Sequence, residues 1–278
     1  MKTIVFILST NYSGSHLLSL LIGSHSRFQH IGEVRGLGKA RINPDRQYCG
    51  LCGGHYNCPV LGGITAENID QIYEIIFSNV GRDVSGLVDT SKKTDWAQRF
   101  LKDNRYDKKF LFLVRDPRSL IRRWSSDKNL NHFRERLKLI KYPPRQIKIG
   151  LTGNMNDVFL GKWLQQNNKI YEFIENNKLD SFVITYHDLV VDQLKSLSNI
   201  MDWLGEKYES GQEEYWNFTH HGSEKYQYKD KRTIELDCRW KDYLSAEQKN
   251  KISNNRDVAY FLEKCGLAMG DDGLMQKK

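Results

Sequence analysis

The sequence has no run of apolar residues long enough to cross a lipid bilayer, which argues against a transmembrane helix. It also lacks a recognisable secretory leader, because the first apolar run stops at the polar residues 9–13 and no small-residue cleavage site follows. We therefore expect the N-terminal run to form a strand. The five cysteines are an odd number and three of them cluster, so no disulfide framework is expected and a reducing, cytoplasmic location is favoured.

Length and charge narrow the class of protein. Of the 278 residues, 39% are hydrophobic and 27% are charged, which is typical of a soluble globular protein. We expect a single domain over residues 1–278, with a Gly/Cys-rich insertion at residues 41–63. The formal net charge of +8 favours an anionic partner, such as nucleic acid, an acidic membrane surface or a ligand with phosphate or sulfate groups, although it can also serve solubility alone.

Four short apolar runs predict buried strands at residues 4–8, 87–88, 110–114 and 182–186. Each is followed by polar, Gly or Pro residues and then a helix-like stretch, and this alternation predicts an α/β fold with a parallel sheet. Helices are expected at residues 65–79, with Thr65 as N-cap, and over much of residues 118–177, with breaks at residues 142–144 and 150–153. Since ligands bind at the carboxyl ends of such strands, the loops after the four runs are where chemistry is expected.

The first of these loops, residues 9–16, is a small, hydroxyl-rich turn that leads into a Leu-rich helix. Free backbone N–H groups and the positive end of the helix dipole suit such a turn to an anion, and Gly14 lets a phosphate approach the backbone closely. The loop is not a Walker A motif, because the lysine of the GxxxxGK[ST] pattern is missing. The alternative is an ordinary strand-to-helix turn with hydroxyl caps.

Basic residues follow two further strands. Arg115 and Arg118 flank an Asp-Pro pair after the third run, and arginine is suited to bidentate phosphate binding. The alternative there is a structural Arg–Asp pair that caps a helix. Lys92 and Lys93 follow the second run, where they can approach the same anion or belong to a solvated capping segment.

Together these segments resemble the PAPS-dependent sulfotransferases, where PAPS is 3'-phosphoadenosine-5'-phosphosulfate. The resemblance is to bacterial members and to the tyrosylprotein and carbohydrate sulfotransferases. Residues 9–16 are similar to the family's 5'-phosphosulfate loop, residues 115–118 to its Arg-(Asp/Asn)-Pro-Arg segment for the 3'-phosphate, and residues 89–92 to its Asp-Ser-Ser-Lys stretch. Residues 185–205 and 220–240 resemble later stretches of the family, the second of which closes over the nucleotide.

The resemblance implies a P-loop-like parallel sheet flanked by helices, with a helical acceptor-binding cap. It implies transfer of a sulfuryl group from PAPS to a hydroxyl or amine of a carbohydrate, small molecule or peptide. The product nucleotide is 3'-phosphoadenosine-5'-phosphate (PAP), and no metal is expected in the reaction. On the same resemblance, the nucleotide-binding residues are Tyr12, Ser13, Gly14, Ser15, His16, Leu17, Arg115, Arg118, Arg123, Gly222 and Lys225.

The resemblance assigns the role of general base to Glu33, because tyrosylprotein sulfotransferases carry a similar Gly-Glu segment after the first helix. Such a base takes the proton of the acceptor hydroxyl. The alternative is a surface glutamate paired with Arg35. His16 and His25 are the other candidates for the base.

The sequence departs from the family pattern at three positions. Tyr12 stands where the family has a basic residue, so Lys92, Lys93 or His16 is expected to stabilise the leaving phosphate. Arg123 replaces the family's 3'-phosphate serine and can itself bind phosphate. The late loop lacks the usual Gly-Asn pair.

Cysteines and a histidine cluster in the insertion, where Cys49, Cys52, His55 and Cys58 fall in one short stretch. Three thiolates and an imidazole can form a tetrahedral zinc site. The spacings are short and the sequence has no second CxxC pair, so free thiols that line a loop are the favoured interpretation and no metal ligand is predicted. Similar Cys-Gly…Cys-Pro segments occur in bacterial sulfotransferase-like sequences, which favours a structural role.

Other classes of function fit parts of the pattern. A nucleotide kinase needs the P-loop lysine, which is absent, and a magnesium-binding acid, for which Asp89 is the one well-placed candidate. A nucleic-acid-binding module needs aromatic residues among its basic ones, and residues 118–148 have few, so neither nucleic acid nor a membrane is expected as a partner. A weakly active relative that only binds the nucleotide is the third alternative.

Residues 36–63 and 129–156, which are expected to form the acceptor pocket, carry no diagnostic pattern.

Overall fold

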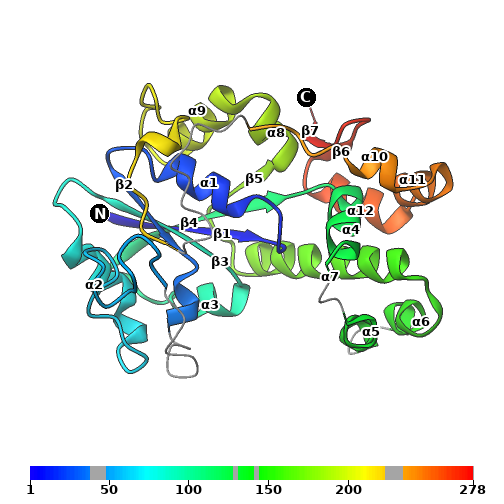
Figure 1. Ribbon diagram of the computed structural model, residues 1–278, viewed down its shortest axis with the longest axis horizontal. Coiled ribbons are helices and arrows are strands. Elements are labelled where there is room, and N and C mark those ends of the chain that lie inside the picture. The colour runs from blue at the N-terminus through cyan, green and yellow to red at the C-terminus, as the bar shows by residue number, and fades with distance from the viewer. Residues whose placement is uncertain (38–47, 128–130, 141–143, 223–233, 278) are drawn as a thin grey trace.

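The computed structural model describes residues 1–37, 48–127, 131–140, 144–222 and 234–277. Its centre is a five-stranded sheet in which all neighbouring strands are parallel, in the order β2-β3-β1-β4-β5 (Figure 1). The strands are β1 (Lys2–Ser9), β2 (Phe28–Gly32), β3 (Gly86–Lys92), β4 (Tyr106–Val114) and β5 (Ser181–Thr185). β1 lies in the middle of the sheet, and residues 4–9 are all buried.

Side chains of the central strands alternate between two hydrophobic cores, one on each face of the sheet. Ile4, Phe6 and Leu8 of β1 belong to one core, whereas Val5 and Ile7 belong to the other. Because successive side chains of a strand point to opposite faces, a strand buried on both faces is apolar at every position. This explains the continuous apolar runs in the sequence.

One face of the sheet is covered by α1 (Ser15–Ile22), α8 (Tyr186–Val191) and α9 (Gln193–Trp203) (Figure 1). Leu18 of α1 and Leu197 of α9 pack in the core with Val5 and Ile7. α8 begins directly after β5, and α1 begins after the short loop 10–14 that follows β1, so both helix N-termini lie at the carboxyl edge of the sheet.

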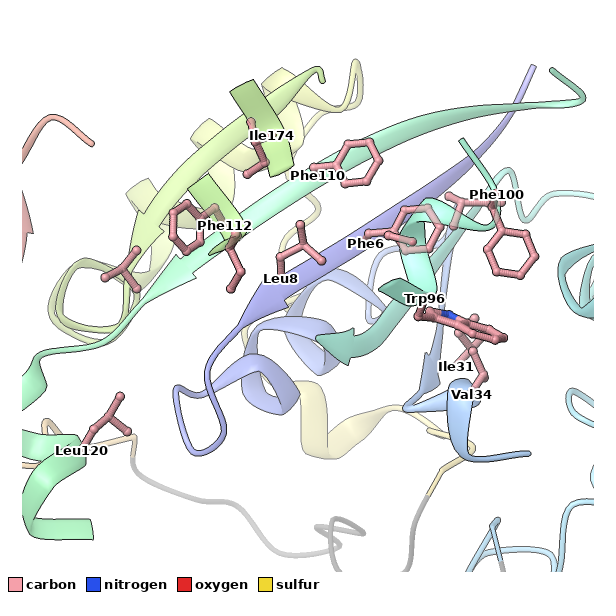
Figure 2. Close-up of a cluster of buried hydrophobic side chains, with 14 of the residues drawn as sticks. Phe6, Leu8, Ile31, Val34, Trp96, Phe100, Phe110, Phe112, Leu120 and Ile174 are labelled. Atoms are coloured by element: carbon pink, nitrogen blue, oxygen red, sulfur yellow. The ribbon is translucent and has the colours of Figure 1, made fainter. Parts of the chain in front are cut away.

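The opposite face is covered by α2 (Ile72–Asn79), α3 (Thr94–Gln98), α7 (Met155–Asn176) and α12 (Arg256–Lys264). Figure 2 shows part of this core, which combines aliphatic side chains with aromatic rings. The rings of Phe6 and Phe110 stack with their centroids 5.3 Å apart, and Trp96 meets Phe100 edge-on at 5.0 Å. Trp96 lies in α3, and Phe100 also stacks on Phe6 of β1 at 6.5 Å, so this packing holds α3 against the sheet.

The remaining elements lie beside the sheet. α4 (Pro117–Ser125) follows β4, and α5 (His132–Ile140) and α6 (Pro144–Thr152) form a helical pair next to α7 (Figure 1). Two 3₁₀ turns are present, η2 (Ile69–Gln71) just before α2 and η3 (Tyr215–Asn217) after α9. The last part of the chain contains α10 (Trp240–Tyr243), α11 (Ala246–Ser253), β6 (Leu267–Met269) and β7 (Leu274–Gln276). Among the described residues, no helix combines the length and apolar character that a membrane span requires.

The predicted α/β fold with a parallel sheet flanked by helices is confirmed, and each of the four predicted strands is present. The structure adds β2, which the sequence analysis did not predict because polar Gln29 and His30 interrupt its apolar pattern. The helix predicted at residues 65–79 starts only at Ile72, so Thr65 is not its N-cap. Thr65 and Asn68 instead exchange hydrogen bonds in a separate turn. Residues 41–47 of the insertion lie outside the described residues.

Candidate active site

The loops that follow β1, β3, β4 and β5 meet at one edge of the sheet. The register pairs Leu8 of β1 with Lys92 at the end of β3, and Val114 at the end of β4 with Thr185 at the end of β5. A cavity of about 430 Å³ opens at this edge. Its lining comprises Tyr12, Gly14, Ser15, His16, Leu17, Lys92, Arg115, Arg123, Tyr186, Tyr215, Ile234, Glu235, Asp237 and Arg239.

The N-terminus of α1 forms part of the cavity wall. Gly14 precedes the helix with a φ of 94°, a left-handed conformation that favours glycine, and no described side chain caps the first turn. The ring of Tyr186 packs against Gly14 so closely that a Cβ atom there would lie 2.6 Å from Tyr186 Cδ2. Residues 14–17 line the cavity, and the first N–H groups of a helix have no intrahelical acceptor, so this end of α1 is suited to an anion.

Arg115 lies in the cavity wall directly after β4. It donates hydrogen bonds to the backbone oxygen of Tyr12 at 2.8 Å and to the carboxylate of Asp237 at 2.9 Å, and its guanidinium carbon lies 4.2 Å from the centre of the Tyr186 ring. Its Nε is buried without a hydrogen-bond partner among the described residues. Burial lowers the pKa of the guanidinium, an effect that Tyr186 and Asp237 partly offset. An anion in the cavity would offset it further.

Arg123 of α4 brings a second guanidinium to this cavity. Its guanidinium carbon lies 4.4 Å from the centre of the Tyr12 ring, which is the range of a cation–π contact. Tyr12 occupies the position at which the resemblance calls for a basic residue, and it is 45% exposed. The positive charge absent from the loop is therefore supplied beside it by a neighbouring helix.

Lys92 and Glu33, two of the residues expected to take part in catalysis, form an ion pair with each other. The Lys92 side chain is 12% exposed and that of Glu33 is 51% exposed. The alternative partner for Glu33, Arg35, instead pairs with Asp95 at 3.2 Å. The structure therefore brings the expected base and the expected cation together, although the two residues are far apart in the sequence.

Lys92 also lines a second cavity of about 280 Å³. The other residues of this lining are Ser9, Lys93, Thr94, Asp95, Lys138, Gln165, Gln166, Lys169 and Ile170. Lys92 is the one described residue that lines both cavities. It therefore stands at the point where the two cavities approach each other.

Three histidines pack in a row that begins with His16 in the wall of the first cavity. The ring centroid of His30 lies 4.9 Å from that of His16 and 5.8 Å from that of His220, and its Nδ1 lies 2.6 Å from Ser19 Oγ. Burial, followed by the charges of Lys92 and His220, lowers the pKa of His16 to about 3. Burial also lowers the pKa values of His30 and His220. His16 is therefore neutral at pH 7, and Lys92 is the better candidate for a stabilising cation.

Two residues expected to bind the nucleotide lie inside the protein instead. Ser13 is fully buried, and its Oγ lies 2.6 Å from Thr10 Oγ1, so the two hydroxyl groups form a hydrogen bond inside the loop. Arg118, with a side chain 6% exposed, donates to both carboxylate oxygens of Asp116 and to the backbone oxygen of Gly270 at 2.7 Å. Neither lines the cavity, and Arg118 fits the alternative of a structural Arg–Asp pair at the start of α4.

The other expected residues have different surroundings. Gly222 is buried beside β2, where a Cβ atom would lie 3.1 Å from His30 Nε2, and its backbone oxygen accepts a hydrogen bond from Gly50. His25, the further candidate for a base, lies with Nε2 3.0 Å from a backbone carbonyl oxygen and lines neither cavity. Lys225 lies outside the described residues.

Several cavity residues were absent from the sequence prediction, among them Tyr186, Asp237 and Arg239. Tyr186 follows β5 directly, so the rule that located the other loops also applies to it. Asp237 and Arg239 form an ion pair at 2.7 Å, and Asp237 also binds Arg115. No local pattern places this pair at the cavity, because Arg115, the other partner of Asp237, is more than one hundred positions away.

The structure is similar to several solved sulfotransferases, whereas no protein-family profile and no curated protein matches the sequence. A sulfotransferase domain from the curacin biosynthetic pathway shares 18% identity at a TM-score of 0.59, with 95% of this chain and 98% of that chain covered. The sulfotransferase domain of the Synechococcus PCC 7002 olefin synthase shares 17% identity at a TM-score of 0.57, with 97% and 98% covered. A sulfotransferase from Alicyclobacillus acidocaldarius shares 13% identity at a TM-score of 0.50, with 95% and 94% covered.

The chain is thus an α/β protein with helices on both faces of a parallel sheet and a cationic cavity at the carboxyl edge of that sheet. Its fold is that of the sulfotransferases, as the sequence resemblance implies. At these identities the likeness is one of fold. The residues of the cavity, and not the fold, determine which reaction the protein can catalyse.

Proposed function

We propose that the chain is a PAPS-dependent sulfotransferase, an enzyme that moves the sulfuryl group of PAPS to a hydroxyl or amine of a polar acceptor. The observation that carries the proposal is the position of Lys92 in the walls of both cavities. A transfer reaction requires donor and acceptor to meet at one point, and a cation there stabilises the charge that develops on the leaving oxygen. The sulfotransferase fold supports the same assignment.

The first cavity suits the donor nucleotide. The N-terminal turn of α1 offers backbone N–H groups to a 5'-phosphosulfate. Arg115 and Arg123, which both line the cavity, are suited to the 3'-phosphate, since guanidinium groups bind phosphate through paired hydrogen bonds. Tyr215 and Ile234 contribute apolar surface for the purine. The 5'-phosphosulfate, the 3'-phosphate and the purine of PAPS thus each have a suitable group in the cavity wall.

The second cavity suits a polar acceptor. Four lysines and two glutamines contribute to its lining. Cationic and amide side chains favour an acceptor that is rich in hydroxyl groups or carries negative charge. A carbohydrate meets this description better than an apolar phenol does. Because Lys138 of α5 belongs to this lining, we assign the helical pair α5 and α6 as the cap over the acceptor.

In the proposed reaction Lys92 and Glu33 have separate roles. The acceptor oxygen or nitrogen forms a bond to sulfur while the bond between sulfur and the phosphate oxygen breaks, and the electron pair of that bond stays on the phosphate oxygen of PAP. Lys92 stabilises this charge, and Glu33 takes the proton from the acceptor. The ion pair holds the Glu33 carboxylate beside the ammonium group of Lys92, although Glu33 itself lines neither cavity.

The contacts of Asp89 disfavour the rival interpretation as a kinase. A kinase of this fold needs an acid at the cavity to hold magnesium. Asp89 is 1% exposed and accepts hydrogen bonds from Tyr73 Oη at 2.7 Å, Trp96 Nε1 at 2.8 Å and Ser91 N at 2.6 Å. Burial raises its pKa. The carboxylate is therefore engaged in the core and lines neither cavity, whereas Asp237, which lines the first cavity, is already paired with Arg115 and Arg239.

We expect PAP to bind with micromolar affinity in the absence of magnesium, and replacement of Arg115 by alanine to weaken that binding by roughly 2–4 kcal/mol. A buried guanidinium that loses a charge-assisted contact with phosphate accounts for a loss of this size. Isothermal titration calorimetry measures both quantities, and about 1.4 kcal/mol corresponds to a tenfold change in Kd.

Arg122→Ala serves as the matched control, because Arg122 lies on α4 beside Arg123 but does not line the cavity. It should bind PAP as the unmodified protein does. Tighter binding of ATP with magnesium than of PAP would contradict the proposed donor. Unchanged PAP affinity in a folded Arg115→Ala variant would instead make Arg115 a structural partner of Asp237.

A further inference from the structure

Three thiols and an imidazole meet at a place that the proposed reaction does not use. Cys49, Cys52 and Cys58 come from the insertion, and His221 comes from the segment before residues 223–233. One ligand atom of each lies within 4.8 Å of all the others. From His221 Nδ1 the distances are 3.8 Å to Cys49 Sγ, 3.5 Å to Cys52 Sγ and 3.3 Å to Cys58 Sγ.

These distances fit a tetrahedral metal site. A zinc ion with Zn–S bonds of about 2.3 Å and Zn–N bonds of about 2.0 Å places its tetrahedral ligand atoms about 3.5–3.8 Å apart. The three Sγ–Nδ1 distances already lie close to this range, without movement of the side chains. All the cysteines are free thiols, so the cluster is not a disulfide in this structure. Thiolate and imidazole together favour zinc over the hard cations magnesium and calcium.

The backbone around the cluster is shaped to present these ligands. The turn after Cys52 contains Gly53 and Gly54, both with positive φ, and Gly54 N donates to Cys49 O at 2.9 Å. Leu61 N points at Cys58 Sγ from 3.4 Å, a contact of the kind that supports a metal-bound sulfur. Cys49 and Cys58 are buried, and thiolates at these positions would be costly without a cation between them.

The fourth ligand differs from the one that the sequence suggests. The ring of His55 stacks on that of Tyr56 at a centroid distance of 3.9 Å, and His55 does not belong to the cluster. His221 takes its place from 163 residues beyond Cys58. The short spacing within the insertion, which argued against a zinc site, is therefore no obstacle, because the insertion supplies only three of the four ligands.

We propose that Cys49, Cys52, Cys58 and His221 bind one zinc ion in a closed, structural site. Four protein ligands leave no coordination position open for a substrate, so the metal has no place in the transfer reaction. Its effect would be to fasten the insertion to residues 220–222. A backbone hydrogen bond from Gly50 to Gly222 already joins the same two segments at 2.9 Å.

The position of the site links the metal to the proposed nucleotide cavity. His220, the neighbour of His221, packs on His30, and Gly222 lies against the end of β2 just before Glu33. The chain reaches the cavity wall again at Ile234. Zinc would thus hold residues 220–222 beside the row of His220, His30 and His16 that reaches the cavity wall, and metal loss should loosen both the fold and that wall.

The test measures metal content and stability in the full chain. Protein purified without added chelator is expected to contain one zinc ion per chain by inductively coupled plasma mass spectrometry. Cys58→Ser and His221→Ala should lose most of that zinc, whereas His55→Ala and Cys265→Ser should keep it, since neither residue belongs to the cluster. Stripping the unmodified protein with a chelator should lower its Tm, and added Zn²⁺ should restore it.

Cobalt provides a readout that does not depend on the variants' folding. Co²⁺ added to stripped, unmodified protein should give the intense visible bands of a tetrahedral site and a thiolate-to-cobalt charge-transfer band, and Zn²⁺ should abolish both. A stripped protein that takes up neither metal would overturn the proposal. A disulfide among the three cysteines in freshly purified protein, or retention of zinc by His221→Ala together with its loss by His55→Ala, would overturn the assigned ligand set.

Discussion

Replacement of Glu33 by glutamine is expected to reduce turnover by about 10²–10⁴-fold, which is the usual contribution of a general base. Glutamine keeps the shape of the side chain but cannot accept the acceptor's proton. The Glu33 side chain is half-exposed and its carboxylate is paired with Lys92, so the substitution leaves the fold intact and frees the ammonium group. Affinity for PAP should therefore hold or rise slightly while turnover falls.

The experiment compares initial rates of PAP formation with PAP affinity from calorimetry. Glu74→Gln is the matched control, because Glu74 is also a half-exposed glutamate in an ion pair, with Arg105, but lines neither cavity and should have a small effect on turnover. Equal losses of affinity and turnover in Glu33→Gln would make Glu33 a structural residue. Full turnover would mean that no base acts at this position. His16 would then be a weak replacement, because its pKa of about 3 makes it a poor proton acceptor.

Replacement of Lys92 by methionine is expected to reduce turnover by about 10²–10³-fold, the size of the loss when one donor to a developing oxyanion is removed. Methionine keeps the apolar stem, so the packing of the largely buried side chain is retained. The positive φ of Lys92 is unaffected, because both residues are unbranched at Cβ. The loss should appear in kcat, since the charge that Lys92 stabilises develops during the reaction.

Lys93→Met is the control for Lys92→Met. Lys93 lines the second cavity but not the first, and burial lowers its pKa. Its replacement should raise the KM for an anionic acceptor and leave the slow hydrolysis of PAPS by water unchanged. Equal effects of the two substitutions on PAPS hydrolysis would contradict the special position of Lys92 between the cavities.

Local patterns in the sequence predicted the buried strands and the loops that line the cavity. The continuous apolar runs give the buried parallel strands because a strand covered on both faces has no polar side. Tyr12, residues 14–16 and Arg115 were placed at the cavity from one rule, that loops after parallel strands gather at one edge. β2 escaped prediction because buried His30 bonds to Ser19, and only the tertiary structure provides that partner.

The parts that could not be predicted depend on residues distant in the sequence. Arg115 and Arg118 look equivalent in the motif, yet Arg118 turns to Asp116 and Gly270 while Arg115 faces the cavity. The pairing of Glu33 with Lys92 follows from the adjacency of β2 and β3, which no spacing reveals. His221 likewise joins the three cysteines only because the chain returns to β2 near its end.

The central claim is that this chain transfers the sulfuryl group of PAPS, and the most direct measurement follows the radiolabelled sulfur of that donor. The protein is incubated with labelled PAPS, first with water alone and then with a panel of hydroxylated carbohydrates, and PAP and labelled products are separated by chromatography. We predict slow release of PAP and free sulfate in water, faster release of PAP with label on a carbohydrate, and loss of both with Lys92→Met. Intact PAPS after prolonged incubation with a folded protein that binds PAP, with and without the acceptors, would contradict the claim of transfer and leave a nucleotide-binding protein with a sulfotransferase fold.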